Sequence, residues 1–125
     1  MNFVRSKSFF FLLTLCLLPL VVVGQSNRGR ISGQVTDSSG GAIPGAKIVV
    51  ENLGTHVART LATNGEGNYF VPDVDPGFYS IRAEAANFKP VLRDRIQVEV
   101  ANDLRIDFQL QPGLVSEVIE IKEEA

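Results

Sequence analysis

Four turn motifs constrain what this chain can fold into. In order, they are Gly33-x-Val35-x-Asp37, Ile43-Pro44-Gly45-Ala46, Thr63-x-x-x-Gly67-x-Tyr69 and Pro76-Gly77-x-Tyr79. Beside and within these motifs lie the combinations Ser38-Ser39-Gly40-Gly41, Asn64-Gly65-Glu66-Gly67 and Asp75-Pro76-Gly77. Their residues supply positive φ or a fixed proline φ, so they reverse the chain. Short segments that are reversed this often are typical of an all-β sandwich or barrel.

The segments between the turns have the alternation of β-strands. The clearest is Leu104–Leu110, where apolar residues alternate with Arg105, Asp107 and Gln109. This pattern indicates one face in the core and the other in water. Further strands are expected at 31–35, 46–52, 57–62, 69–71, 79–83 and 96–100. The sequence therefore predicts about seven short strands in an all-β domain over residues 30–110, with no sustained helical pattern.

Residues 1–24 have the features of a secretory signal peptide, which we expect to be helical. Arg5 and Lys7 precede the apolar run Phe9–Val23, and Val22 and Gly24 stand at the two positions that a signal peptidase reads. We expect cleavage after Gly24, which leaves residues 25–29 as a short linker before the domain.

Two other interpretations of the leader are less favoured. A membrane anchor needs about 20 apolar residues, whereas this run has 15 and contains Pro19. A lipoprotein would carry a small residue before its modified cysteine, but Leu15 precedes Cys16 and the apolar run continues beyond it.

The mature chain is expected to be acidic and free of cysteine. Loss of Arg5 and Lys7 leaves ten basic and fourteen acidic residues, a net charge of −4. The basic residues are scattered apart from Arg93 and Arg95, which argues against a nucleic-acid partner. Loss of Cys16 with the leader excludes a disulfide, so about 100 residues must be stabilised by their core.

The C-terminal segment, residues 111–125, allows two interpretations. Gln111-Pro112-Gly113 ends the last strand of the domain, and Val115, Ile119 and Ile121 then alternate irregularly with glutamates. The segment is either a linker with a frayed acidic tail or a linker with a short extra strand. Such a strand could pair with an open sheet edge in this chain or in a neighbouring copy.

In this order and spacing, the four motifs resemble the carboxypeptidase regulatory-like domain over about residues 29–110. The resemblance implies a seven-stranded Greek-key sandwich, transthyretin (prealbumin)-like and placed among the carbohydrate-binding-like folds. The sequence departs from the family pattern at Asn87, where glycine usually precedes an aromatic residue. Asparagine tolerates the left-handed region, so we expect this turn to be kept. The resemblance makes these residues structural turn positions: Gly33, Asp37, Pro44, Gly45, Gly67, Tyr69, Pro76, Gly77 and Tyr79.

The leader, the domain and the tail are together similar to the beginning of large TonB-dependent outer-membrane receptors. In those receptors the module precedes a plug and a barrel, and 125 residues are too few to encode that barrel. The sequence leaves open whether the chain is a free-standing relative or a truncated receptor gene. The resemblance implies an exported protein in the periplasm, at the outer membrane or outside the cell.

The sequence offers no strong catalytic or metal-binding candidate. His56 is the sole histidine, whereas a catalytic zinc needs three protein ligands, so we expect an exposed turn residue. Asp73 and Asp75 could begin a calcium loop, but aspartate before Pro76-Gly77 is ordinary turn chemistry. Neither metal is expected, and neither is any cofactor.

Nucleophiles and acid-base groups also lack partners at a recognisable spacing. Ser38, Ser39 and Ser116 have no nearby base in the sequence. Asp94 and Glu99 are expected to pair with neighbouring arginines rather than to act on a glycosidic bond.

Two phenylalanines are candidates for an interaction surface. Strand alternation that points Tyr69 and Tyr79 inward points Phe70 and Phe78 outward. Together they could form an apolar docking patch for a protein domain or a glycan, although ordinary packing between strands is the commoner explanation.

Three functions follow, in decreasing order of support. The first is a non-catalytic module for protein interaction or spacing in the bacterial envelope. The second is a carbohydrate-binding module, which the absence of tryptophan disfavours. The third is an enzyme, which would need more than the single histidine.

Overall fold

The structure is a computed structural model that describes residues 27–122 together with Pro19 and Gly24. Apart from these two residues, the expected leader and its helix lie outside the described residues. All the regular elements within the described residues are strands: β1 Gly29–Asp37, β2 Lys47–Asn52, β3 Ala58–Ala62, β4 Asn68–Val74, β5 Gly77–Glu84, β6 Val91–Val98, β7 Asp103–Arg105, β8 Phe108–Leu110 and β9 Ile119–Lys122.

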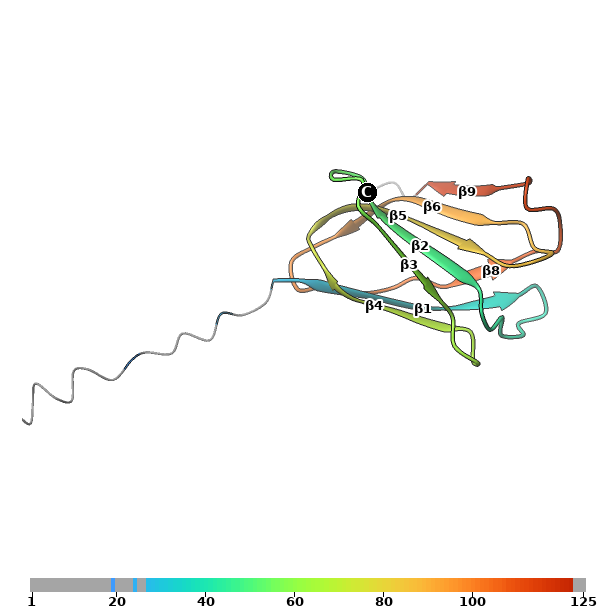
Figure 1. Cartoon of the computed structure of the whole chain (residues 1–125), viewed down its shortest axis with the longest axis horizontal. Coiled ribbons are helices and arrows are strands. Elements are labelled where there is room, and N and C mark those ends of the chain that lie inside the picture. Colours follow the sequence, from blue (N-terminus) through green and yellow to red (C-terminus); the bar gives the residue numbers. More distant parts are fainter. Residues whose placement is uncertain (1–18, 20–23, 25–26, 123–125) are drawn as a thin grey trace, which may run out of the picture.

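The strands form two sheets packed face to face (Figure 1). One sheet has the order β4-β1-β7, with β8 also paired to β1, and the other has the order β3-β2-β5-β6-β9. Pairing is parallel between β1 and both β7 and β8, and between β6 and β9; the other pairs are antiparallel. The predicted all-β sandwich is confirmed.

The strand number differs from the predicted seven, because the described residues contain nine. The segment Leu104–Leu110 divides into β7 and β8 at Ile106 and Asp107. There the side chain of Asp107 accepts the backbone N–H of Gln34 at 2.8 Å, so a carboxylate replaces a backbone acceptor at the break. The ninth strand is β9, in the C-terminal segment.

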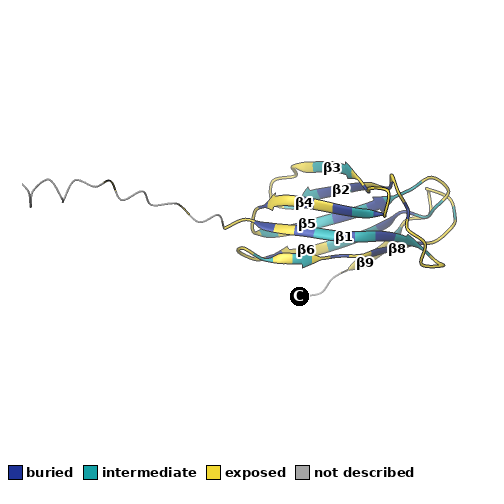
Figure 2. Cartoon of the chain, turned by 90° about the horizontal axis from the view of Figure 1, so that it is seen from below, coloured by how far each residue is buried: buried dark blue, intermediate teal, exposed yellow. Residues whose placement is uncertain are grey.

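The core follows the alternation of the strands (Figure 2). In β4 the buried Tyr69 and Val71 flank the exposed Phe70, and in β5 the buried Tyr79 and Ile81 follow the exposed Phe78. The inward faces of both sheets supply a continuous apolar core. Burial of this kind is the main favourable contribution to folding in a domain without disulfides.

The second and third motifs are joined by the buried side chain of Thr63. Its hydroxyl donates to the carbonyl of Ile43 at 2.7 Å and accepts the N–H of Ala46 at 2.8 Å. Between them, Gly45 has φ +70°, a conformation that favours glycine. Thr63 therefore fixes the proline-glycine turn against the end of β3.

The C-terminal segment is part of the sheet. The N–H of Lys89 donates to the carbonyl of Gln111 at 2.8 Å, and Lys89 also forms an ion pair with Glu117 at 3.1 Å. β9 then pairs in parallel with Val91–Asp94 of β6. Of the two interpretations of this segment, the structure has the extra strand, paired within the same chain.

The turn at Asn87 is kept, as expected. Asn87 has φ +67°, and its carbonyl accepts the N–H of Gly113 at 3.1 Å. Asparagine therefore occupies the left-handed position at which the family usually has glycine.

Candidate functional site

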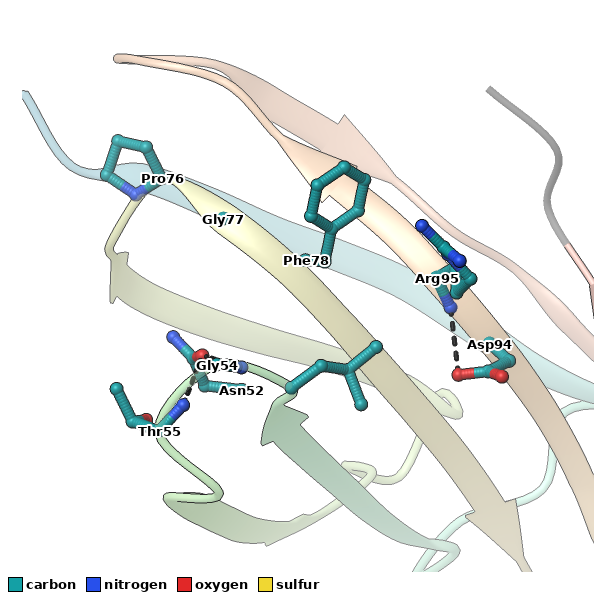
Figure 3. Close-up of a pocket in the computed structure, with 9 residues that line it drawn as sticks. Asn52, Gly54, Thr55, Pro76, Gly77, Phe78, Asp94 and Arg95 are labelled. Atoms are coloured by element: carbon teal, nitrogen blue, oxygen red, sulfur yellow. Dashed lines mark hydrogen bonds between the residues drawn. The ribbon is translucent and has the colours of Figure 1, made fainter.

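A depression of about 840 Å³ lies on the outer face of the five-stranded sheet (Figure 3). Residues 52–55 of the β2–β3 turn, 76–78 at the start of β5 and 94–95 of β6 line it. We call it the Phe78 depression. Its volume lies in the range of about 300–1,000 Å³ that is usual for ligand sites.

Asn52 and Tyr79 hold the two turns of the depression together. The Asn52 Oδ1 accepts the N–H groups of Gly54 at 2.8 Å and Thr55 at 3.1 Å, and its Nδ2 donates to the Tyr79 hydroxyl at 3.2 Å. The same hydroxyl donates to the carbonyl of Asp75 at 2.7 Å. Through this network Tyr79, a residue of the fourth motif, supports the walls of the depression. The sequence analysis did not select Asn52, but its place before Leu53-Gly54-Thr55 is typical of an asparagine whose side chain closes a turn.

The third wall of the depression is a β-bulge in β6. Tyr79 pairs with Ile96 and Ile81 pairs with Arg93, so Ser80 faces both Asp94 and Arg95. Arg95 has φ +57°, and its N–H donates to the Asp94 Oδ1 at 3.0 Å. The bulge places the Arg95 guanidinium over the Phe78 ring, 5.5 Å from the ring centroid, within cation–π range.

Phe70 and Phe78 do not form the common patch that the sequence suggested. Both are exposed, at 54% and 40%, as strand alternation predicted. However, β4 and β5 belong to different sheets, so the two rings lie on the opposite outer faces of the sandwich. The chain crosses from one sheet to the other through Asp75 and Pro76.

In the first motif, Gly33 and Asp37 have separate structural roles. Gly33 lies opposite Tyr69 in the β1–β4 pair. Asp37 closes the following turn, since its Oδ1 accepts the Ser39 hydroxyl at 2.6 Å and the N–H groups of Ser39 and Gly41 at 2.9 Å. The Ser39 hydroxyl, followed by the Gly41 N–H, lowers the pKa of Asp37 below its ordinary value.

Gly67 of the third motif has φ +75°, and its carbonyl accepts the N–H of Val35 at 2.8 Å. A side chain there would approach the carbonyl of Val35 within 2.6 Å. Both the positive φ and the close approach of the Val35 carbonyl therefore favour glycine at position 67.

The candidates for metal chemistry lie apart. His56 is exposed in the β2–β3 turn, with its Nδ1 3.2 Å from a Glu51 carboxylate oxygen. Asp75 forms an ion pair with Arg28 at 3.1 Å, and the backbone carbonyl of Asp73 accepts a hydrogen bond from Arg59. Over the described part of the chain, no group of three or more His, Cys, Asp and Glu side chains is arranged to hold a metal ion.

Arg93 points into the sandwich, unlike its neighbour Arg95. Its Nη2 donates to the carbonyl of Asp107 at 2.9 Å, and its guanidinium lies 5.4 Å from the centroid of the buried Phe108 ring. Arg93 therefore joins the two sheets on one side, as Arg59 does on the other through the carbonyl of Pro72 at 2.6 Å. The sequence analysis did not predict that Arg93 would point into the sandwich and Arg95 onto the outer face.

Comparison with known proteins supports the family resemblance. The family model for the carboxypeptidase regulatory-like domain matches residues 30–111. A TonB-dependent transporter, Oar of Myxococcus xanthus, is 34% identical over 98 residues, which cover 77% of this chain and 9% of the transporter. The match thus spans only a small part of that relative. No helix in the described residues has the length and apolar character to cross a membrane.

Solved structures share the sandwich. A putative carbohydrate binding protein from Bacteroides uniformis is 26% identical, with a TM-score of 0.57, over 70% of this chain and 43% of that one. Catechol 1,2-dioxygenase from Pseudomonas arvilla is 16% identical, with a TM-score of 0.53, over 78% of this chain and 56% of that one. The second likeness shows the fold alone.

Proposed function

We propose that this chain, which belongs to the carboxypeptidase regulatory-like domain family, is an exported, non-catalytic module of the bacterial cell envelope that binds a protein partner. The observation that carries the proposal is the Phe78 depression. It combines an exposed ring, a guanidinium and turn backbone on the open face of a sheet. Mixed apolar and charged surfaces of this kind, with aromatic and arginine side chains, are typical of protein interfaces.

Similarity to part of a TonB-dependent transporter supports the envelope location. It also suggests that the module works beside a larger assembly, as a binding or spacing element. Export would follow from the leader expected at residues 1–24.

Photo-crosslinking from each face of the sandwich tests the binding role. A photoreactive amino acid replaces Phe78 in one variant and Phe70, on the opposite face, in a matched control, and both are expressed with the leader in the native cells. We expect crosslinks to an envelope protein from position 78 only. Equal crosslinking from both positions, or none from either, would contradict a docking face at Phe78 and favour a spacer role for the module.

Fractionation and intact mass of the same preparations test export and size. A soluble envelope species that begins at Gln25 is the expected product of a free-standing module. A much larger membrane-bound product would instead make this chain the front of a receptor.

Carbohydrate binding is the second candidate, supported by the 26% identity to a putative carbohydrate binding protein. Asn52 and Asp94 could bond sugar hydroxyls, but Arg95 already lies over the Phe78 ring on which a sugar would stack. A glycan array tests this function, and a hit that is lost in Phe78→Ser would favour it over a protein partner.

A further inference from the structure

Arg95 occupies a backbone position that ordinarily belongs to glycine. Its φ of +57° lies in the left-handed region, inside a bulge where two residues of β6 face Ser80. Arginine is strained there and glycine is not. Bulges often re-aim a side chain, and a strained residue on an exposed face is a reason to look for a role in binding.

One face of the Arg95 guanidinium lies on the Phe78 ring, and its in-plane N–H groups are directed away from the ring and can bind a ligand. It lies over Phe78 at 5.5 Å, and across the described residues no carboxylate lies within ion-pair distance of it. Contact with the ring limits the conformations of the side chain, which lowers the entropy cost of binding. The in-plane N–H groups of a guanidinium match the two oxygens of a carboxylate.

We propose that the Phe78 depression binds an acidic segment of a partner protein. A carboxylate side chain of that segment pairs with Arg95, and an apolar side chain contacts Phe78. Asp94 accepts the backbone N–H of Arg95, and its carboxylate lies on the far side of Arg95 from Phe78 in Figure 3. The inference rests on the proposed function and names the chemistry of the partner.

The test uses the exported protein and fluorescein-labelled short peptides of alternating glutamate and valine, measured by fluorescence anisotropy. Matched peptides carry glutamine or lysine in place of glutamate. We expect the glutamate peptide to bind at least about tenfold more tightly than the glutamine peptide, because a charge-assisted pair is lost. Backbone amide shifts in NMR spectra should change at residues 54–55, 78 and 94–95, which line the depression.

Variants identify the residue responsible. Arg95→Gln should weaken binding of the glutamate peptide about tenfold, and Arg95→Lys should bind with intermediate affinity because an ammonium cannot pair bidentately. Arg105→Gln, which removes an exposed arginine of the other sheet, should bind as the parent does. All three should keep the melting temperature of the parent.

Equal binding of the glutamate and glutamine peptides would overturn the inference, as would unchanged binding by Arg95→Gln or NMR shifts confined to residues outside the depression. The experiments distinguish failure of the acidic-ligand proposal from failure of the proposed binding function. Crosslinks from position 78 without binding of acidic peptides would leave the binding module and reject its acidic ligand. Binding of acidic peptides without crosslinks in cells would support the site and reject the cellular role.

Discussion

Gly33 of β1 lies opposite Tyr69 of β4, and the ring of Tyr69 passes over the place where a side chain at position 33 would stand. The Tyr69 hydroxyl donates to the carbonyl of Ile106 at 2.5 Å, in the segment between β7 and β8. The first and third sequence motifs are therefore two halves of one contact, which ties three neighbouring chain segments together.

Substitution of Gly33 by alanine should destabilise the domain strongly. The new Cβ would overlap the carbonyl of Ile106 and come within 2.8 Å of the Tyr69 ring, and overpacking of this kind costs about 1–3 kcal/mol. Gly65→Ala is the control, because nothing lies within 4 Å of its Cβ, and it should change stability by less than about 0.5 kcal/mol. Urea unfolding checks both, and equal stabilities would contradict the packing argument.

Tyr69→Phe should cost about 1–2 kcal/mol below pH 10, because it removes the donor to the buried carbonyl of Ile106. Burial raises the pKa of Tyr69 well above its ordinary value of 10.0. The unfolded chain therefore releases this proton first, and the stabilisation is lost as pH rises beyond about 10. Urea midpoints across this pH range should converge for parent and variant. A constant difference would show that the phenol does not titrate differently in the folded state.

Asp37→Asn should weaken the turn after β1 in a pH-dependent manner. Hydrogen bonds from Ser39 and Gly41 lower the pKa of Asp37 below its ordinary value of 3.8. A lowered pKa stabilises the fold above that value, and the contribution is lost as pH falls through the lowered pKa. The difference in urea midpoint between parent and variant should therefore be largest near neutral pH and shrink below about pH 4. Ser39→Ala should reproduce part of the effect.

Arg95→Gly should leave stability within about 0.5 kcal/mol of the parent. Relief of a left-handed arginine gains about 1–2 kcal/mol, whereas the greater freedom of glycine in the unfolded chain and the lost cation–π contact cost a similar amount. Arg105→Gly is the matched control, since Arg105 is a strand residue without positive φ, and it should lose about 0.5–1 kcal/mol. Calorimetry or urea unfolding compares the two. A larger loss in Arg95→Gly would make Arg95 a structural residue.

Much of the sandwich could be predicted from strand alternation because alternation reports burial directly. Tyr69 and Tyr79 point inward and Phe70 and Phe78 outward, as expected. Alternation does not say to which sheet a strand belongs, so the joint Phe70–Phe78 patch was wrong. The connection through Asp75 takes the chain from one sheet to the other. Which sheet a strand joins depends on its pairing with strands distant in the sequence, so local alternation does not determine it.

The arginine side of the candidate site could not be predicted for a related reason. The strand expected at 96–100 begins at Val91 instead, because the bulge at Asp94 and Arg95 interrupts the alternation of β6. A bulge is defined by the register of the neighbouring strand, which a single segment does not contain. Arginine at a left-handed position also gives no local signal of the kind that glycine or asparagine gives.

Deletion of residues 114–125 should destabilise the domain and promote self-association. The deletion removes β9, the ion pair of Glu117 with Lys89, and Ile119, which packs against the core. Loss of a partly buried isoleucine and an edge strand should cost about 1–2 kcal/mol, and the uncovered edge of β6 over Val91–Asp94 becomes a template for another chain. Light scattering after size exclusion should show larger species for the deletion than for the parent. Unchanged stability and unchanged oligomeric state in the deletion would mean that β9 contributes neither packing nor protection of the edge.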